Sequence, residues 1–213
     1  MDFLLKVGQA KYIADMYDNE YLFFNLFSSF RKNEKDPCGR NDPREANVTN
    51  KQVIYLELKT PNGKTIKLSE ISKNFNAQFN EHPTVIPNNI CSLYILRFDN
   101  ELKFQRVDDR VLCLGDKTLL IYNLGHYFDI LDKSLESEKF EFSRKPVKYY
   151  NPKTFDGVLN FHDKDESFEY QKEYRILIDT PGTDTIKIKL PGLKKISAVV
   201  DTEKINTLEI KIV

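Results

Sequence analysis

The sequence has few of the residues from which several common catalytic sites are built. It contains only eight glycines in 213 residues, and it has no GxGxxG, GxxxxGKS/T or GxSxG motif. These absences argue against a Rossmann dehydrogenase, a P-loop enzyme and a serine hydrolase. The three histidines, His82, His126 and His162, lie far apart and outside any HxxxH or HExxH pattern, so we expect no metal site.

Cysteine is also scarce, and the three present are Cys38, Cys91 and Cys113. Their number is odd, their spacing is wide, and none belongs to a CxxC pair. The pattern indicates neither a disulfide framework nor a zinc knuckle. We therefore expect three reduced thiols, as is typical of a cytoplasmic protein.

Long hydrophobic runs and an excess of one charge are both missing. No segment approaches the roughly 18 apolar residues of a membrane span, and Asp2 stands where a signal peptide has a basic residue. The 32 basic and 32 acidic side chains cancel, which argues against non-specific binding to nucleic acid or to a membrane surface. We expect a cytoplasmic protein with no membrane partner.

Aromatic residues are plentiful, with 15 Phe and 11 Tyr in a chain that is 40% hydrophobic, enough for a sizeable core. Helical spacing predicts two main helices, at 9–19 and at 124–135, the second with Asn123 as its N-cap. Period-two patterns predict strands at 3–7, 21–25, 53–58, 65–68, 92–98, 110–114, 118–122, 140–142, 147–150, 170–178, 185–190, 196–200 and 208–213. Residues 33–50 and 70–90 are expected to be irregular. Without a repeat or a linker, 1–213 is predicted to form one strand-rich α+β domain with a mixed or antiparallel sheet.

The first candidate functional region runs from Tyr21 to Glu45. An apolar strand beginning at Tyr21 ends in Asn25, and Arg31 and Arg40 follow among several carboxylates. Arginines ordered by carboxylate pairs can keep donors available for a phosphate. The alternative is a solvated loop held by ordinary ion pairs.

The second candidate region is the expected strand that contains Gln171, Glu173 and Arg175. A period of two places these three polar side chains on one face. If that face borders a cleft, the carboxylate can bind a ribose hydroxyl. The alternative is the solvated face of an antiparallel sheet.

The tripeptide Gln171-Lys172-Glu173 resembles the QxE form of the signature of ADP-ribosyltransferases. The order of a first strand, a helix, a second aromatic strand and a late strand with the glutamate is also similar to that fold. The matching segments cover about a fifth of the chain, and they resemble a broad group of uncharacterised bacterial proteins. The resemblance implies NAD as substrate, Glu173 as the residue that stabilises the oxocarbenium-like transition state, and Gln171 as a residue that orients the acceptor.

This chain departs from the family pattern in two places. The first strand offers only Lys6 where the family has an arginine or histidine, and the Ser-Thr-Ser motif of the second strand is missing. Contacts to NAD would therefore fall to Lys6, Tyr21, Asn25, Arg31 and Arg40. Arg175, beside the catalytic glutamate, is expected to contact the substrate.

The resemblance implies a bacterial toxin or antiphage defence effector that transfers ADP-ribose to a macromolecular acceptor. That acceptor, a protein or a nucleic acid, is the expected partner, and an antitoxin protein is a candidate second one. Two other interpretations stay open. One is an NAD-independent ribonuclease that uses Glu173 as general base, with Arg175 and Arg31 on a phosphate. The other is a non-catalytic interaction module whose aromatic-rich surface binds a protein partner.

Overall fold

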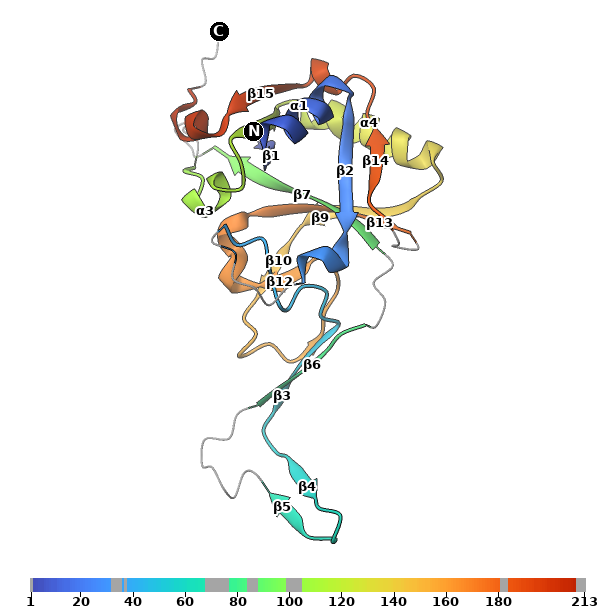
Figure 1. The fold of residues 1–213 in the computed structure, drawn as a ribbon, viewed down its shortest axis with the longest axis vertical. Helices are drawn as coiled ribbons and strands as arrows, with labels where there is room; N and C mark the ends of the chain where they lie inside the picture. The colour runs from blue at the N-terminus through green and yellow to red at the C-terminus, as the bar shows by residue number, and fades with distance from the viewer. Residues whose placement is uncertain are drawn as a thin grey trace.

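The computed structural model describes residues 2–31, 36, 38–67, 77–83, 88–98, 105–180 and 184–209. Its body is built on an eight-stranded sheet in which β14, β2, β7, β1, β8 and β15 follow one another, while β13 lies between β7 and β9 (Figure 1). Every strand pair in this sheet is antiparallel. A parallel pair, β10 with β12, makes the fold mixed.

In chain order, and with 3-10 helices written η, the elements follow one another from the first strand to the last short helix. They are β1 (Asp2–Gly8), α1 (Ala10–Asp18), β2 (Tyr21–Leu26), η1 (Phe27–Phe30), β3 (Thr49–Val53), β4 (Glu57–Lys59), β5 (Thr65–Lys67), β6 (Ala77–Glu81), β7 (Asn88–Arg97), α3 (Asp109–Leu112), β8 (Lys117–Ile121), α4 (Leu124–Ser137), β9 (Glu141–Pro146), β10 (Lys148–Tyr150), β11 (Gly157–Val158), β12 (Asp163–Asp165), η2 (Glu166–Gln171), β13 (Glu173–Asp179), β14 (Ile186–Lys189), η3 (Leu193–Lys195), β15 (Ser197–Asp201) and η4 (Thr202–Thr207).

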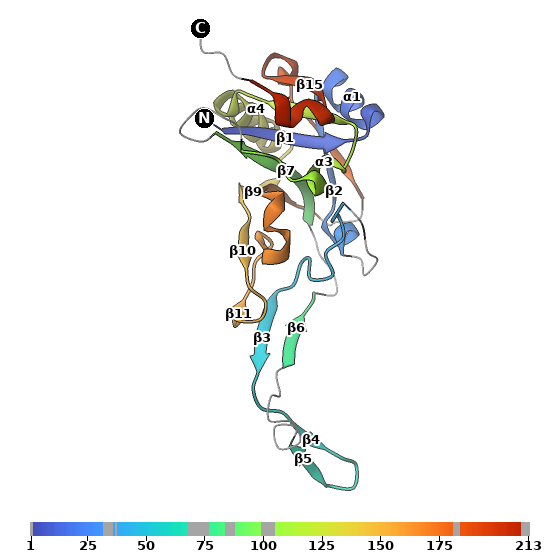
Figure 2. The same cartoon turned by 90° about the vertical axis from the view of Figure 1, so that its left-hand side faces the viewer.

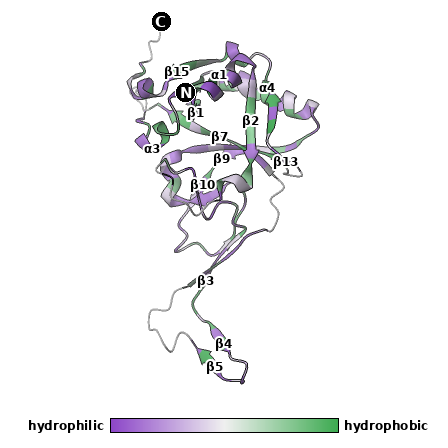
Figure 3. Ribbon diagram, viewed as in Figure 1, coloured by the Kyte–Doolittle hydropathy of each residue, from purple (hydrophilic) through white to green (hydrophobic). Residues whose placement is uncertain are grey.

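Both predicted helices pack on the sheet through their apolar faces. Helix α4 buries Tyr127, Leu131 and Leu135, and α1 buries Ile13 and Met16, all in one core cluster with the sheet. The predicted N-cap is confirmed, because the side chain of Asn123 accepts a hydrogen bond from the backbone N–H of His126. The hydrophobic colouring covers much of β2 where it crosses the body (Figure 3).

A thin β arm extends away from this body. It consists of β3 and β6, which pair with each other, and of the β4–β5 hairpin at its end (Figures 1 and 2). Strand β11 pairs with β3 where the arm leaves the body. The structure is thus a strand-rich, mixed α+β single domain with few helices, as the sequence predicts.

Several predicted strand boundaries are wrong. The expected strand 53–58 is divided into β3 and β4, and the irregular stretch expected at 70–90 contains β6 and the start of β7. The expected strand 110–114 is instead the short helix α3, because Asp108 caps it by accepting from the N–H of Arg110. The hairpin expected at 61–63 is confirmed. The strand expected at 208–213 lies mostly outside the described residues.

The predicted reduced state of the cysteines is also wrong. Cys38 and Cys113 form a disulfide with a Cα–Cα distance of 5.6 Å, and only Cys91 is a free, buried thiol. The two bonded residues are 75 positions apart, so their spacing gives no signal of pairing. The fold brings the segment after β2 next to the turn that follows α3.

Among the described residues, no helix combines the length and the apolar character needed to cross a membrane.

Candidate functional site

A cavity of about 640 Å³ lies between β1, α1, β2 and β7 and is closed on one side by residues 40–45 and 164–175. This volume is in the range of small-molecule sites, about 300–1,000 Å³. Seven of the eight candidate residues line it, namely Lys6, Tyr21, Asn25, Arg40, Gln171, Glu173 and Arg175. The eighth, Arg31, does not line the cavity. It lies near His82 instead, where burial of the imidazole and, to a smaller extent, the charge of Arg31 lower the pKa of that histidine.

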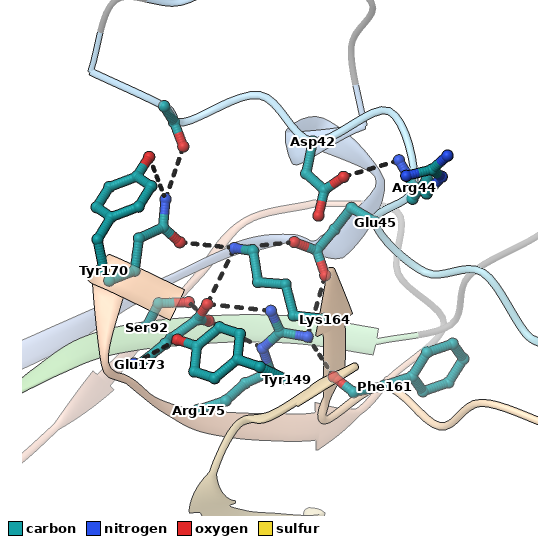
Figure 4. A network of polar contacts seen from close by, with 12 residues as sticks. Asp42, Arg44, Glu45, Ser92, Tyr149, Phe161, Lys164, Tyr170, Glu173 and Arg175 are labelled. Atoms are coloured by element: carbon teal, nitrogen blue, oxygen red, sulfur yellow. Dashed lines mark hydrogen bonds and ion pairs between the residues drawn. The ribbon is translucent and has the colours of Figure 1, made fainter. Parts of the chain in front are cut away.

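Four charged side chains meet at the floor of the cavity (Figure 4). Arg175 donates to Glu173 from Nε (2.9 Å, to Oε1) and from Nη2 (3.1 Å, to Oε2). Lys164 Nζ lies 3.0 Å from Glu173 Oε2 and 3.3 Å from Glu45 Oε2. Arg175 Nη1 lies 3.0 Å from Glu45 Oε1. Two cations therefore alternate with two carboxylates, and all four are almost completely buried.

Glu173 also has two neutral neighbours. The hydroxyl of Ser92 donates to Oε1 at 2.5 Å, and the backbone N–H of Glu173 donates to the phenolic oxygen of Tyr149 at 2.9 Å. The Glu173 carboxylate thus accepts four hydrogen bonds, two from Arg175 and one each from Lys164 and Ser92. The donors fix the position of the carboxylate in the cavity.

Gln171 does not lie on the strand with Glu173, as the sequence pattern predicted. It ends η2, and Lys172 follows in the left-handed region with φ of 37° before β13 begins at Glu173. Gln171 nevertheless reaches the same group, since its Oε1 accepts from Lys164 Nζ at 2.8 Å. Its Nε2 donates to the carbonyl of Gly39 at 2.7 Å, which ties the cavity floor to the segment that carries Arg40.

Gly39 is required at this contact. Its φ is 68°, and an added Cβ would lie only 1.8 Å from the hydroxyl of Tyr170. A side chain at this position would therefore displace either the ring of Tyr170 or the 38–45 segment, and the left-handed backbone also favours glycine.

The charges at the floor decide the protonation states. Burial by itself raises the pKa of Glu173, but the charges of Arg175 and Lys164 outweigh it and hold that pKa well below its ordinary value. Burial by itself lowers the pKa of Lys164, but the charges of Glu173 and Glu45 raise it by more, so the net shift is upward. Near neutral pH, Glu173 is a carboxylate and Lys164 an ammonium ion. Glu173 can therefore stabilise positive charge, but it is a weak general base.

Another carboxyl beside the floor behaves differently. Burial and the charge of Glu45 raise the pKa of Asp42 to about 6. Asp42 does not line the cavity, and one of its side-chain oxygens accepts from the backbone N–H of Arg44 at 2.8 Å.

A second polar group borders the cavity on the side of α1. Tyr21 donates its hydroxyl proton to Asp15 at 2.5 Å, and Lys187 Nζ lies 3.3 Å from Asp15 and 4.4 Å from the centre of the Tyr21 ring. Lys6, from β1, donates to the backbone carbonyl of Ser92 at 2.9 Å. Apolar side chains of β1, α1 and β7 complete the wall.

The sequence patterns missed several of the residues that build this site: Asp15, Glu45, Ser92, Tyr149, Lys164 and Lys187. Glu45 lies in the loop that the sequence indicated, although nothing there distinguished it from its charged neighbours. Lys164 carries no motif at all. Among the described residues, no group of three or more His, Cys, Asp and Glu side chains could hold a metal ion.

Comparison with known proteins gives no relatives: no family model, no curated protein and no solved structure matches this chain. The resemblance to ADP-ribosyltransferases stays a prediction from the sequence.

Proposed function

We propose that the protein is an ADP-ribosyltransferase-like enzyme that cleaves NAD and transfers ADP-ribose to a macromolecular acceptor. The observation that carries this proposal is the ionised Glu173 at the floor of a nucleotide-sized cavity, among six other residues selected from the sequence. In this reaction the bond between ribose C1′ and the nicotinamide nitrogen breaks, and its electron pair leaves with neutral nicotinamide. The acceptor nucleophile then bonds C1′ and releases its proton to solvent.

Glu173 suits the charge that develops in this reaction. The ribose gains positive charge as nicotinamide leaves, and a fixed carboxylate stabilises that charge without having to reorganise. Its low pKa is an advantage here, since the group must stay ionised. The same low pKa counts against the ribonuclease alternative, which needs Glu173 to accept a proton.

A ribose hydroxyl can reach Glu173 by replacing Ser92. Among the described groups that bond the Glu173 carboxylate, Ser92 is the only neutral donor, and it lines the cavity. Exchange of one hydroxyl donor for another leaves both charge pairs of Glu173 intact. The negative phosphates of NAD would then form ion pairs with Lys6 and with the exposed guanidinium of Arg40. One N–H of this guanidinium already donates to the backbone carbonyl of Leu114.

The test is the release of nicotinamide from NAD by purified protein in cell lysate, with Glu173→Gln as the variant. Loss of the carboxylate charge should lower the rate about 100- to 1,000-fold. Glu169→Gln is the matched control, because Glu169 is exposed and close in sequence, and its rate should equal that of the wild type. Circular dichroism must show that both variants are folded. Equal rates for wild type and Glu173→Gln would remove Glu173 from the mechanism.

A second candidate function is binding of a nucleotide without catalysis. It is favoured by the four hydrogen bonds that already occupy the Glu173 carboxylate. Such a protein would bind NAD and release no nicotinamide with any acceptor. The cellular role as a toxin or defence effector rests on the sequence resemblance, and growth arrest on expression that is lost in Glu173→Gln would support it.

A further inference from the structure

The end of the β arm is the β4–β5 hairpin. Strands β4 and β5 form a two-stranded sheet, and no other described strand pairs with it. An isolated two-stranded hairpin is only marginally stable in water, whereas three or more strands with a hydrophobic face are stable. The hairpin is well separated from the body in both views (Figures 1 and 2).

One face of this hairpin is apolar. Leu58 lies directly opposite Ile66, so the two side chains share a face, and 47% of Leu58 is exposed. The other face holds Glu57, Lys59 and Lys67, with Glu57 opposite Lys67. The apolar colouring reappears in β5 at this tip (Figure 3).

The outer edge of β4 presents backbone groups that the hairpin itself does not use. The N–H of Thr60 donates to the carbonyl of Lys64 at 2.9 Å, which makes these two residues a hydrogen-bonded pair. Bonded and non-bonded pairs alternate along an antiparallel ladder, so Leu58 and Ile66 form the next bonded pair. The N–H and C=O groups of Glu57 and Lys59 therefore point away from β5, toward the open edge.

We propose that β4 pairs with β4 of a second copy of this chain, antiparallel and centred on Leu58. In this register Glu57 of each copy faces Lys59 of the other, and the two Leu58 residues face each other on the symmetry axis. The outward backbone groups of Glu57 then exchange hydrogen bonds with those of Lys59 of the second copy. The outward direction of the backbone groups of Glu57 and Lys59 and the order of charges along β4 thus favour the same register.

Charge complementarity is the reason to choose a second copy as the partner. Lysine on an edge strand usually prevents pairing, but here each lysine meets a glutamate of the same strand in the other copy. Opposite charges on facing strands favour pairing. Tyr55 donates to Oε1 of Glu57 within one chain, and the carboxylate keeps further lone pairs for Lys59 of the other copy. The product is a four-stranded sheet with Leu58 and Ile66 of both copies on one face.

This pairing is independent of the proposed enzymatic function, since no residue of β3 to β6 lines the cavity. The first test is sedimentation velocity over a hundredfold range of protein concentration. The wild type should form a dimer. Lys59→Glu places glutamates opposite each other at both symmetric contacts and should weaken the dimer about tenfold or more. The triple variant Glu57→Lys/Lys59→Glu/Lys67→Glu restores opposite charges in the same register and keeps opposite charges at positions 57 and 67 across the hairpin, so it should restore the dimer.

The second test fixes the register. In a non-bonded pair the Cα atoms are about 4.5 Å apart, which a disulfide can span. Leu58→Cys should therefore give a covalent dimer on mild oxidation. Thr60→Cys should not, because the two positions would be about 13 Å apart along the strands. A wild type that is monomeric throughout, a triple variant as weak as Lys59→Glu, or equal crosslinking at 58 and 60 would overturn the proposal.

Discussion

Arg175 holds both oxygens of the Glu173 carboxylate, with Nε 2.9 Å from Oε1 and Nη2 3.1 Å from Oε2. The two residues are separated by one position on β13 and therefore project from the same face of the strand. Arg175 has no exposed surface, and Glu173 is 5% exposed. In such a site, each charge depends on the other to offset its loss of hydration.

Removal of Arg175 should destabilise the protein strongly. Arg175→Met keeps much of the side-chain length but leaves Glu173 and Glu45 with only Lys164 as counter-charge, so we expect a loss of about 3–5 kcal/mol in the free energy of unfolding. Urea denaturation measures it. Arg106→Met is the matched control: Arg106 makes an exposed ion pair with Asp109, and its removal should leave the unfolding midpoint unchanged. Similar losses for the two variants would contradict a buried charge network at the cavity floor.

Acidification should destabilise the protein through His162. Burial, followed by the charges of Lys145 and Arg175, lowers its pKa to about 4, whereas an unfolded histidine has a pKa near 6.5. Between these pH values the unfolded chain binds more protons than the folded chain. The contribution of His162 to the free energy of unfolding is therefore fully present above pH 6.5 and is lost as the pH drops to 4. The loss by pH 4 should be about 3 kcal/mol, because a difference of one pKa unit corresponds to about 1.4 kcal/mol.

The measurement is the free energy of unfolding of wild type and His162→Asn between pH 7 and pH 4. The difference between them should shrink as the pH falls, because the variant has no imidazole to charge. His126→Asn, at an exposed histidine, should follow the wild type throughout. A constant difference between wild type and His162→Asn would show that His162 titrates alike in both states.

The disulfide should stabilise both the fold and the cavity. Cys38 begins the segment that carries Arg40 and Glu45 into the cavity, and its bond to Cys113 closes a long loop. Reduction should cost about 2–4 kcal/mol in the free energy of unfolding. It should also weaken ligand binding, because Arg40 is held less firmly. Thermal melting with and without reductant tests this. Cys113→Ser should resemble the reduced protein and should not respond to reductant.

The sequence predicted the parts of the fold that depend on local patterns. Helix α4 and its cap at Asn123 follow from apolar spacing and one side chain, and β2 and β8 lie close to where they were expected. Helix α3 is not predicted, because its short apolar run also fits a strand. The carboxylate of Asp108, a typical N-cap, is the one local signal that indicates a helix here.

The candidate site could be predicted only in part, for a physical reason. Glu173 and Arg175 share a strand face, which period two reveals. Glu45 and Lys164 join them through contacts between distant segments, which no local pattern records. Gln171 was selected for a strand that it does not belong to, and it reaches the site instead through the left-handed turn at Lys172.

Binding of NAD in the cavity can be measured by calorimetric titration of NAD into the wild-type protein. We expect saturable binding at one site per chain, lost in Asn25→Trp, which places an indole in the cavity. It should be retained in Lys133→Trp, at an exposed position of α4 outside the cavity. Failure of the folded, disulfide-bonded wild type to bind NAD would show that this cavity is not an NAD site, as would undiminished binding by Asn25→Trp.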